Sequence, residues 1–228
     1  MNLSYDILIP AFNARQTLPT ILASIGKLNV RPNSVIVVDD GSTDNTALTV
    51  DQFPFVHLIR LKSNSGKGKA LRIGMKQFLK NKNSAFLLMM DADGQHPVDS
   101  IPEFIKHINE CNCDIVIGNR VRKLGIMPWS RIFSNTVSSL ITSWITGIKI
   151  PDSQCGFRLL RRTVIESVLL EENGFQIETE LIIKAAKQGF SFGFVSVPTI
   201  YNGQKSYIKH VNDTIRFLKI ILGELVRS

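Results

Sequence analysis

Two carboxylates, Asp91 and Asp93, follow directly on a strongly apolar run in residues 85–97, AFLLMMDADGQHP. The run is too short to cross a membrane, and its continuous apolar character predicts a strand buried on both faces. Carboxylates at such an end must be solvated, paired or bound to a cation. Because the two charges repel each other, Mg²⁺ or Mn²⁺ would suit the pair, and Gln95 adds a neutral oxygen as a third candidate ligand.

Two further strand ends carry polar residues of a similar kind. The first predicted strand, 5–12, ends in the segment Pro10-Ala-Phe-Asn13, and the second, 34–40, ends on Asp39 and Asp40. In open parallel sheets, ligands bind beyond the carboxyl ends of the strands. We therefore expect these residues to line one crevice together with Asp91.

The elements that must position these residues alternate along the chain. Strands are expected at 5–12, 34–40, 56–61 and 85–91, with helices at 14–28, 42–53 and 68–81 between them. After these come a helix at 98–110, a strand at 113–121, a helix at 132–148, a short strand or turn and a helix within 156–170, a helix at 178–189 and a strand at 192–201. This alternation predicts an α/β three-layer sandwich with a mainly parallel, Rossmann-like central sheet.

The Gly-rich segment SNSGKGKA, residues 63–70, has neither the GxxxxGK[ST] spacing of a P-loop nor a GxGxxG after the first strand. Nucleoside triphosphate hydrolysis and dinucleotide binding are both disfavoured. Lys67, at the start of a predicted helix, would suit a phosphate, although a flexible loop before a helix explains the glycines equally well.

The bulk properties set limits on the partners. The length of 228 residues predicts one large globular domain or one domain with an appendage. The net charge of +8 predicts anionic partners: nucleic acid, nucleotide phosphates or a lipid surface. The three cysteines fit no zinc pattern, so we expect reduced, small core residues and a cytoplasmic compartment. No signal peptide is expected at the N-terminus, and the Ser and Thr content of 132–148 argues against a transmembrane helix.

Several ordered blocks resemble one family. IPAFNA, VVDDGSTDNT, NSGKGKALRIG, MMDADGQHP, IGNR and DSQCGFR occur in the order and spacing of family 2 glycosyltransferases with the GT-A fold. The later blocks, with GFQIETE and GQKS, resemble the dolichol-phosphate mannosyltransferase or polyprenyl-phosphate glycosyltransferase branch. The resemblance implies a GT-A domain over 1–206, followed by a C-terminal amphipathic helix at 207–228 for membrane or partner contact.

The resemblance also implies roles for individual residues. Donor-binding residues would be Pro10, Phe12, Asp39, Asp40, Lys67, Asp91, Ala92 and Asp93, with Asp91, Asp93 and Gln95 as metal ligands. The acceptor and phosphate side would comprise Arg120, Arg131, Asn135, Asp152, Arg158, Gln176, Lys205 and Ser206. Catalytic candidates are Asp93, Arg120, Arg131, Glu178 and Glu180. Family members often carry Tyr and Glu where this chain has Phe12 and Ala14, which leaves the donor base and sugar open.

The implied reaction is metal-dependent, inverting transfer of a hexose from a nucleotide-diphosphate sugar, of GDP-mannose or UDP-glucose type, to a polyprenyl or dolichyl phosphate. An acceptor phosphate is already charged and needs no base, whereas a sugar hydroxyl, as in polysaccharide synthesis, requires a carboxylate. Glu178 and Glu180 lie where hydroxyl-using relatives place that base, and Asp152 is a further candidate. Alternatively, Glu180 only complements the dipole of a helix.

Two other classes compete with this interpretation. A nucleotidyltransferase would carry a basic Gly-rich loop after the first strand, where this chain has PAFNARQTLP. A nucleic-acid binder is supported only by net charge, so no nucleic acid is expected. Trp129, Trp144 and the basic amphipathic tail, with Arg120 and Arg131 beside the tryptophans, favour an anionic lipid head group and peripheral attachment to the cytoplasmic face of the membrane.

Overall fold

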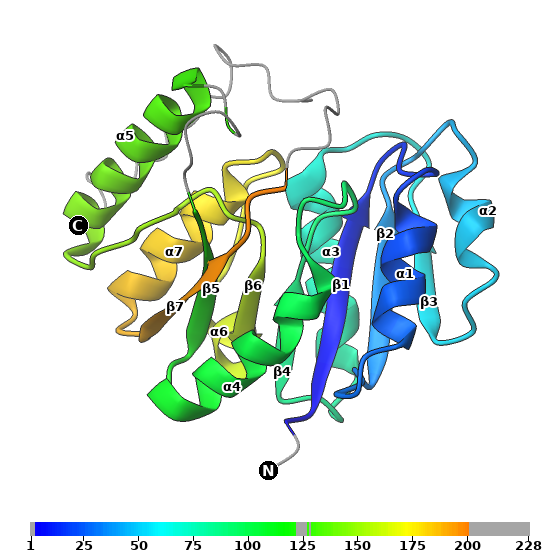
Figure 1. Cartoon of the computed structure of the whole chain (residues 1–228), viewed down its shortest axis with the longest axis horizontal. Coiled ribbons are helices and arrows are strands. Elements are labelled where there is room, and N and C mark those ends of the chain that lie inside the picture. Colours follow the sequence, from blue (N-terminus) through cyan, green and yellow to red (C-terminus); the bar gives the residue numbers. More distant parts are fainter. Residues whose placement is uncertain (1–2, 122–126, 128, 201–228) are drawn as a thin grey trace.

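The computed structural model describes residues 3–121, 127 and 129–200, apart from the side chain of Ser130. Within this part of the chain, seven strands form one sheet in the order β3-β2-β1-β4-β6-β5-β7 (Figure 1). The strands are β1 Tyr5–Ala11, β2 Ser34–Asp39, β3 Val56–Arg60, β4 Phe86–Met89, β5 Ile115–Arg120, β6 Arg158–Arg161 and β7 Phe192–Val197. The predicted α/β sandwich with a mainly parallel sheet is confirmed.

Strand direction follows from the connections. β1 pairs in parallel with β2 and β4, β2 with β3, and β5 with β7, as helical crossovers require. β6 is antiparallel to both β4 and β5. Every residue of β4 is buried, as the apolar run at 85–90 predicts. Because β1, β2 and β4 run the same way, their carboxyl ends meet at one edge of the sheet.

The helices cover both faces of the sheet (Figure 1). They are α1 Leu18–Gly26, α2 Thr46–Val50, α3 Lys67–Lys80, α4 Ile101–Cys111, α5 Trp129–Thr146, α6 Arg162–Ser167 and α7 Ile177–Lys187, with a 3₁₀ turn, η1, at Val98–Ser100. α1 and α4 lie on one face, whereas α3, α6 and α7 lie on the other, and α5 runs beside α7. Their apolar sides join the strands in a single buried core.

The helix expected at 42–53 is much shorter in the structure. Asn45 has a left-handed backbone, with φ of 63°, so the regular helix begins only at Thr46. The carboxylate of Asp44 accepts the backbone N–H of Thr46, and its other oxygen accepts that of Arg15. The side chains of this segment therefore bind neighbouring backbone, which competes with helix formation.

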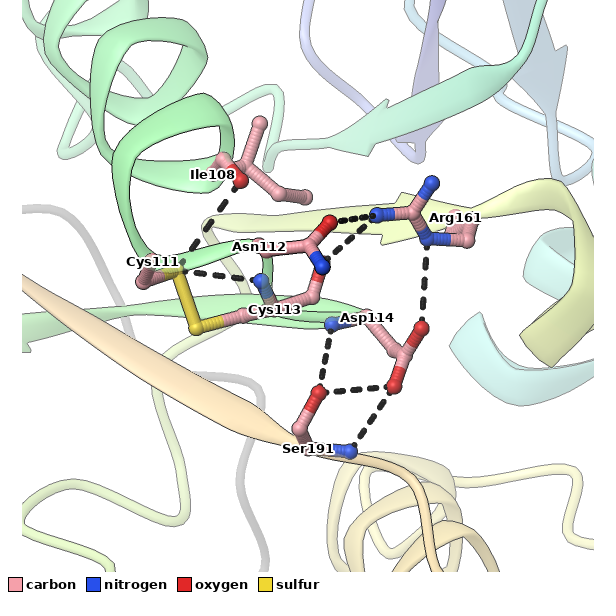
Figure 2. The surroundings of a disulfide bond; sticks show 7 residues. All are labelled: Ile108, Cys111, Asn112, Cys113, Asp114, Arg161 and Ser191. Atoms are coloured by element: carbon pink, nitrogen blue, oxygen red, sulfur yellow. Dashed lines mark hydrogen bonds and ion pairs between the residues drawn. A yellow bond between two sulfur atoms is a disulfide. The ribbon is translucent and has the colours of Figure 1, made fainter.

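The expectation of three reduced core cysteines is wrong for two of them. Cys111 and Cys113 form a disulfide (Figure 2). Cys155 is a buried free thiol. Cys111 ends α4, and the left-handed Asn112, with φ of 49°, turns the chain so that the two Cα atoms lie 5.2 Å apart. The disulfide removes the support that the cysteines gave to a reducing compartment.

Polar contacts anchor the same corner of the domain (Figure 2). Asp114 Oδ2 accepts from the backbone N–H and the hydroxyl of Ser191 at 3.0 and 2.7 Å. Its Oδ1 lies 3.2 Å from Arg161 Nε. These bonds tie the starts of β5 and β7 to the end of β6, independently of the disulfide.

The predicted helix at 207–228 lies outside the described residues. Among the helices that the structure does describe, none is both long enough and apolar enough to span a bilayer.

Candidate active site

A pocket of about 810 Å³ opens at the carboxyl ends of β1, β2 and β4. It brings together the predicted donor residues Pro10, Phe12, Asp40, Lys67, Asp91, Ala92 and Asp93. Its remaining lining comes mainly from 11–17, from the loop before α3 and from Phe175, which sequence reasoning did not single out. The crevice expected from the three polar strand ends is therefore present, and its size suits a small ligand.

Lys67, which lines the pocket, bridges two carboxylates. Its ammonium lies 2.6 Å from Asp91 Oδ1 and 2.7 Å from Glu178 Oε1. Although burial disfavours the ammonium, the two carboxylates raise its pKa, and the ammonium in turn outweighs burial to lower the pKa of Asp91. Gly156 makes this close approach feasible, because a Cβ there would lie 2.8 Å from Glu178 Oε1 and 2.9 Å from Asp91 Oδ2.

His96 fixes the backbone at the start of the acidic motif, and sequence reasoning did not assign it a role. Its Nδ1 accepts the backbone N–H of Asp91 at 2.9 Å, so the ring is neutral with its proton on Nε2. Burial lowers the pKa of His96 to about 4, and the ring stacks on Phe157 with centroids 5.1 Å apart. Its position in DADGQHP, five residues after Asp91, was the available signal.

Asp93 is the second carboxylate of the motif. Burial, and then the charge of Asp91, raise the pKa of its carboxyl group. Its Oδ1 accepts the backbone N–H of Gln95 at 2.9 Å, which turns the chain after β4. Gln95 itself is not among the residues that line the pocket.

The donor set fits a divalent cation that is shared with a ligand. Among the described residues, no group of three or more His, Cys, Asp or Glu side chains converges as a complete metal cage. Asp91 and Asp93 both line the pocket, and a lysine ammonium already lies against Asp91 as a cation. Mg²⁺ and Mn²⁺ commonly take one or two carboxylates from the protein and further oxygens from phosphates and water.

The two acidic residues that end β2 have different surroundings. Asp40 lines the pocket, and its two oxygens accept the backbone N–H groups of Ser65 and Gly66, each at 2.8 Å. Asp39 is fully buried behind it, with Oδ1 accepting from Ser42 N–H at 3.0 Å and Oδ2 3.6 Å from Arg60 Nε. Asp40 thereby fixes the loop that presents Lys67, whereas Asp39 holds the turn after its own strand.

The segment after β1 is built around Asn13, which has a left-handed backbone with φ of 51°. Its side-chain oxygen accepts the backbone N–H of Thr43, while its own N–H donates to the hydroxyl of Ser42. Thr17, which sequence reasoning also missed, donates its hydroxyl to the carbonyl of Ala92. These bonds hold the ends of β1, β2 and β4 together around the pocket.

Arg120 and Asp152 form a two-pronged ion pair outside the residues that line the pocket. Arg120 Nε lies 2.7 Å from Asp152 Oδ2, and its terminal Nη2 donates to Oδ1 at 2.9 Å. Although burial opposes its charge, the hydrogen bond and charge of Asp152 raise the pKa of the guanidinium. Arg131 is half-buried in α5, and Asn135 is buried on the same helix.

Arg158, the first residue of β6, and Gln176, the residue before α7, both have buried side chains. The guanidinium of Arg158 donates to the carbonyls of Cys155, Ser153 and Glu178 at 2.7, 2.9 and 2.6 Å, so it organises the backbone around Glu178. Gln176 lies at the N-terminus of α7. Lys205 and Ser206 fall outside the described residues.

The two glutamates that begin α7 diverge. Glu178 faces Lys67, as described above, whereas Glu180 accepts the backbone N–H groups of Glu171 and Glu172 at 2.9 and 3.0 Å. Glu180 also pairs with Lys184 at 2.7 Å, so its carboxylate is committed to holding the segment before the helix. The geometry therefore separates a pocket-side glutamate from one bound to local backbone.

The family model for glycosyl transferase family 2 matches residues 6–169. An uncharacterized protein of Methanocaldococcus jannaschii is 33% identical over 193 residues, which cover 80% of this chain and 82% of that protein. The polyprenol monophosphomannose synthase of Mycolicibacterium smegmatis is 29% identical over 206 residues, covering 86% and 76% of the two chains. A UDP-N-acetylglucosamine–dolichyl-phosphate N-acetylglucosaminyltransferase of Methanococcus voltae is 27% identical, covering 86% and 85%.

Solved structures share the fold at low identity. Mannosyl-3-phosphoglycerate synthase from Rubrobacter xylanophilus superposes with a TM-score of 0.74 at 17% identity, covering 99% of this chain and 73% of that one. A Mycobacterium tuberculosis glucosyl-3-phosphoglycerate synthase, solved with Mn²⁺ and UDP-glucose, has a TM-score of 0.70 at 15% identity and covers 99% and 78%. The match to the family model and the relatives place the chain among the glycosyltransferases: it belongs to glycosyl transferase family 2, with the GT-A fold.

Proposed function

We propose that the protein transfers a hexose, with inversion, from a nucleotide-diphosphate sugar of GDP-mannose or UDP-glucose type to a polyprenyl or dolichyl phosphate. The observation that carries this proposal is the pocket of about 810 Å³ in which Asp40, Asp91, Asp93 and Lys67 meet beyond the carboxyl ends of three parallel strands. Two relatives are named for transfer to polyprenol or dolichyl phosphate, which supports the acceptor class.

In this proposal the donor's base and ribose lie against Pro10, Phe12 and the end of β2, and its diphosphate lies near Asp91 and Asp93. These two carboxylates would hold Mg²⁺ or Mn²⁺, which when bound supplies Lewis-acid stabilisation of the departing diphosphate. Lys67 adds a second positive charge at the same end of the pocket, because its ammonium lies against Asp91. The Mn²⁺ in a structural relative's complex with UDP-glucose supports the choice of metal.

The acceptor side of the proposal rests on the Arg120–Asp152 pair, with Arg131 and Asn135 on α5. A guanidinium recognises a phosphate through two parallel hydrogen bonds, and Asp152 holds that of Arg120 in one orientation. An acceptor phosphate attacks without a general base, so in the proposed reaction neither Glu178 nor Glu180 needs to take up a proton. The phosphate end of such a lipid lies at a membrane surface, which requires peripheral contact with the bilayer.

The test is a panel of nucleotide-diphosphate sugars, each with Mg²⁺ or Mn²⁺, scored first by thermal shift and then by transfer of labelled sugar to polyprenyl phosphate. We expect one donor class to raise the melting temperature only with metal and then to yield lipid-linked sugar. Transfer to a saccharide hydroxyl, with none to the lipid phosphate, would replace the acceptor assignment. No stabilisation by any nucleotide sugar would remove the proposal itself.

A further inference from the structure

Helix α5 carries its large apolar side chains on its outer face. Trp129, Phe133, Leu140 and Trp144 are 76, 65, 64 and 75% exposed, and Val137 between them is 37% exposed. Recurring every three or four residues, these five positions fall within an arc of about 80° around the helix. We call this set the α5 stripe.

The inner face of the same helix is polar. Ser138, Ser139 and Thr142 are buried, as is Asn135. The hydroxyl of Ser138 lies 3.1 Å from that of Ser153, and the backbone N–H of Ser153 donates to the hydroxyl of Ser139, also at 3.1 Å. The helix is thus attached to the domain partly through hydroxyl groups. In a water-soluble domain a surface helix usually turns its apolar side toward the core and its polar side toward water, and α5 shows the opposite orientation.

An outward stripe of two tryptophans, a phenylalanine, a leucine and a valine exposes apolar surface that monomeric proteins rarely leave contiguous. The charge near it indicates the partner. α5 contains no acidic residue, and the exposed Lys149 follows three residues after its end. The one charged residue of α5, Arg131, is half-buried and lies on the inner side of the helix, about 160° around the axis from the centre of the stripe. The whole chain carries a net charge of +8. Tryptophan and basic residues together are typical of contact with an anionic membrane interface.

We propose that the α5 stripe docks flat on an anionic lipid surface, with the helix axis parallel to the membrane plane. The buried polar face holds the helix against the domain, so only the stripe can enter the interface. In this arrangement the apolar side chains reach the acyl boundary, while the exposed Lys149 lies at the level of the phosphates.

The stripe is connected to the acceptor side of the active site, and this part of the inference rests on the proposed function. Ser153, which bonds to the inner face of α5, follows directly after Asp152, the partner of Arg120. Docking of α5 therefore sets the position of the Arg120–Asp152 pair relative to the bilayer surface, where the phosphate of a polyprenyl lipid lies.

The two tryptophans make a direct test possible, because they are the only ones in the chain and both belong to the stripe. The full-length protein is titrated with vesicles of phosphatidylcholine containing phosphatidylglycerol while tryptophan emission is recorded. We expect solvent-exposed emission in buffer, a shift to shorter wavelength with vesicles, and quenching by lipids brominated on the acyl chain. Neutral phosphatidylcholine vesicles should give a smaller shift.

The double variant Phe133→Ser, Leu140→Ser keeps both tryptophans and removes apolar area from the stripe. Because both side chains lose the apolar area that would be buried in the bilayer interface, we expect vesicle affinity to fall at least about tenfold. Leu48 and Leu169 are 61 and 74% exposed elsewhere, so Leu48→Ser, Leu169→Ser is a matched control that should bind like the unmodified protein. Equal binding by both double variants would overturn the proposal.

Other occupants of the stripe give different results. If residues 207–228 or a second copy cover it, emission in buffer is already at short wavelength or changes with protein concentration, and vesicles cause no further shift; either result overturns the proposal. A second assay, sugar transfer to a detergent-solubilised polyprenyl phosphate, tests the proposed function separately from vesicle binding. The Phe133→Ser, Leu140→Ser variant should retain this transfer, because the acceptor is no longer in a bilayer. If the proposed function is wrong, the unmodified protein shows no such transfer but still binds vesicles.

Discussion

The ammonium of Lys67 lies 2.6 Å from Asp91 Oδ1, so the first carboxylate of the acidic motif already has a cationic partner. The same ammonium lies 2.7 Å from Glu178 Oε1, which joins the start of α3 to the start of α7. A cation that binds Asp91 must therefore share this carboxylate with Lys67 or displace its ammonium. Removing the charge of Lys67 should therefore change both the stability of the protein and its affinity for a divalent cation, and both quantities can be measured.

Replacing Lys67 with methionine should destabilise the metal-free protein, because Asp91 and Glu178 lose their common counter-charge. Breaking a buried ion pair by removing one partner costs about 3–5 kcal/mol of unfolding free energy. We expect Mn²⁺ to restore much of that loss, with tighter Mn²⁺ binding than in the unmodified protein, measured by calorimetry and thermal melts. Lys69→Met, two residues along and exposed, is the control. Loss of stability that Mn²⁺ does not restore would argue against a metal at Asp91.

Asp93→Asn should leave the metal-free protein as stable as before, since the pKa of Asp93 is raised by burial and by the neighbouring charge of Asp91. The metal-dependent rise in melting temperature with a nucleotide sugar should disappear, and transfer should fall about 10²–10³-fold. Thermal shift with and without Mn²⁺ measures the first effect. Asp99→Asn, on an exposed residue of η1, should change neither quantity. Retention of the metal-dependent shift in Asp93→Asn would remove this residue from the metal site.

Glu178→Gln and Glu180→Gln test whether either glutamate acts as a general base in transfer or only stabilises the fold. With a phosphate acceptor, Glu178→Gln should keep transfer within about tenfold, whereas loss of a general base costs about 10²–10⁴-fold. Glu180→Gln should lower the free energy of unfolding by about 1–3 kcal/mol, because an amide cannot accept both backbone N–H groups of Glu171 and Glu172. Its specific activity below the unfolding transition should be normal. A large loss of transfer in Glu178→Gln would favour a hydroxyl acceptor.

Asp6→Asn should change the pH dependence of stability at the other end of β1. Asp6 is fully buried, and although Ser84 and Arg162 act in the opposite sense, burial raises its pKa. The folded state therefore binds the proton more strongly than the unfolded state, so Asp6 lowers stability as the pH rises from the ordinary pKa of Asp through the raised value.

The stability of the asparagine variant should no longer fall with rising pH for this reason, and the variant should melt at a higher temperature near neutral pH. In the unmodified protein the hydroxyl of Ser84 donates to Asp6 Oδ1 at 2.6 Å, and the side-chain oxygen of asparagine can still accept this hydrogen bond. Thermal melts across the acid range provide the measurement. Parallel stability curves for the two proteins would show that Asp6 does not titrate with a raised pKa.

The sequence by itself determined the sheet, its direction and the edge at which the site lies. Apolar strands that alternate with helices can bury their faces only in a layered parallel sheet, and that topology brings the ends of β1, β2 and β4 together. The occurrence of Asp91 and Asp93 at the end of a buried strand, together with the sequence motifs around them, was therefore enough to predict the pocket and the family.

Only the tertiary structure decided which of these side chains face one another. The Lys67–Asp91–Glu178 bridge joins residues 111 positions apart in sequence, and Glu178 and Glu180 diverge because one meets Lys67 while the other meets the backbone of Glu171 and Glu172. The period of a helix gives the angle between side chains on its own surface, but not which face packs on the domain. For α5, hydrogen bonds between Ser153 and the hydroxyl groups of Ser138 and Ser139 turn the polar face of the helix toward the domain. The two tryptophans therefore lie on the exposed side.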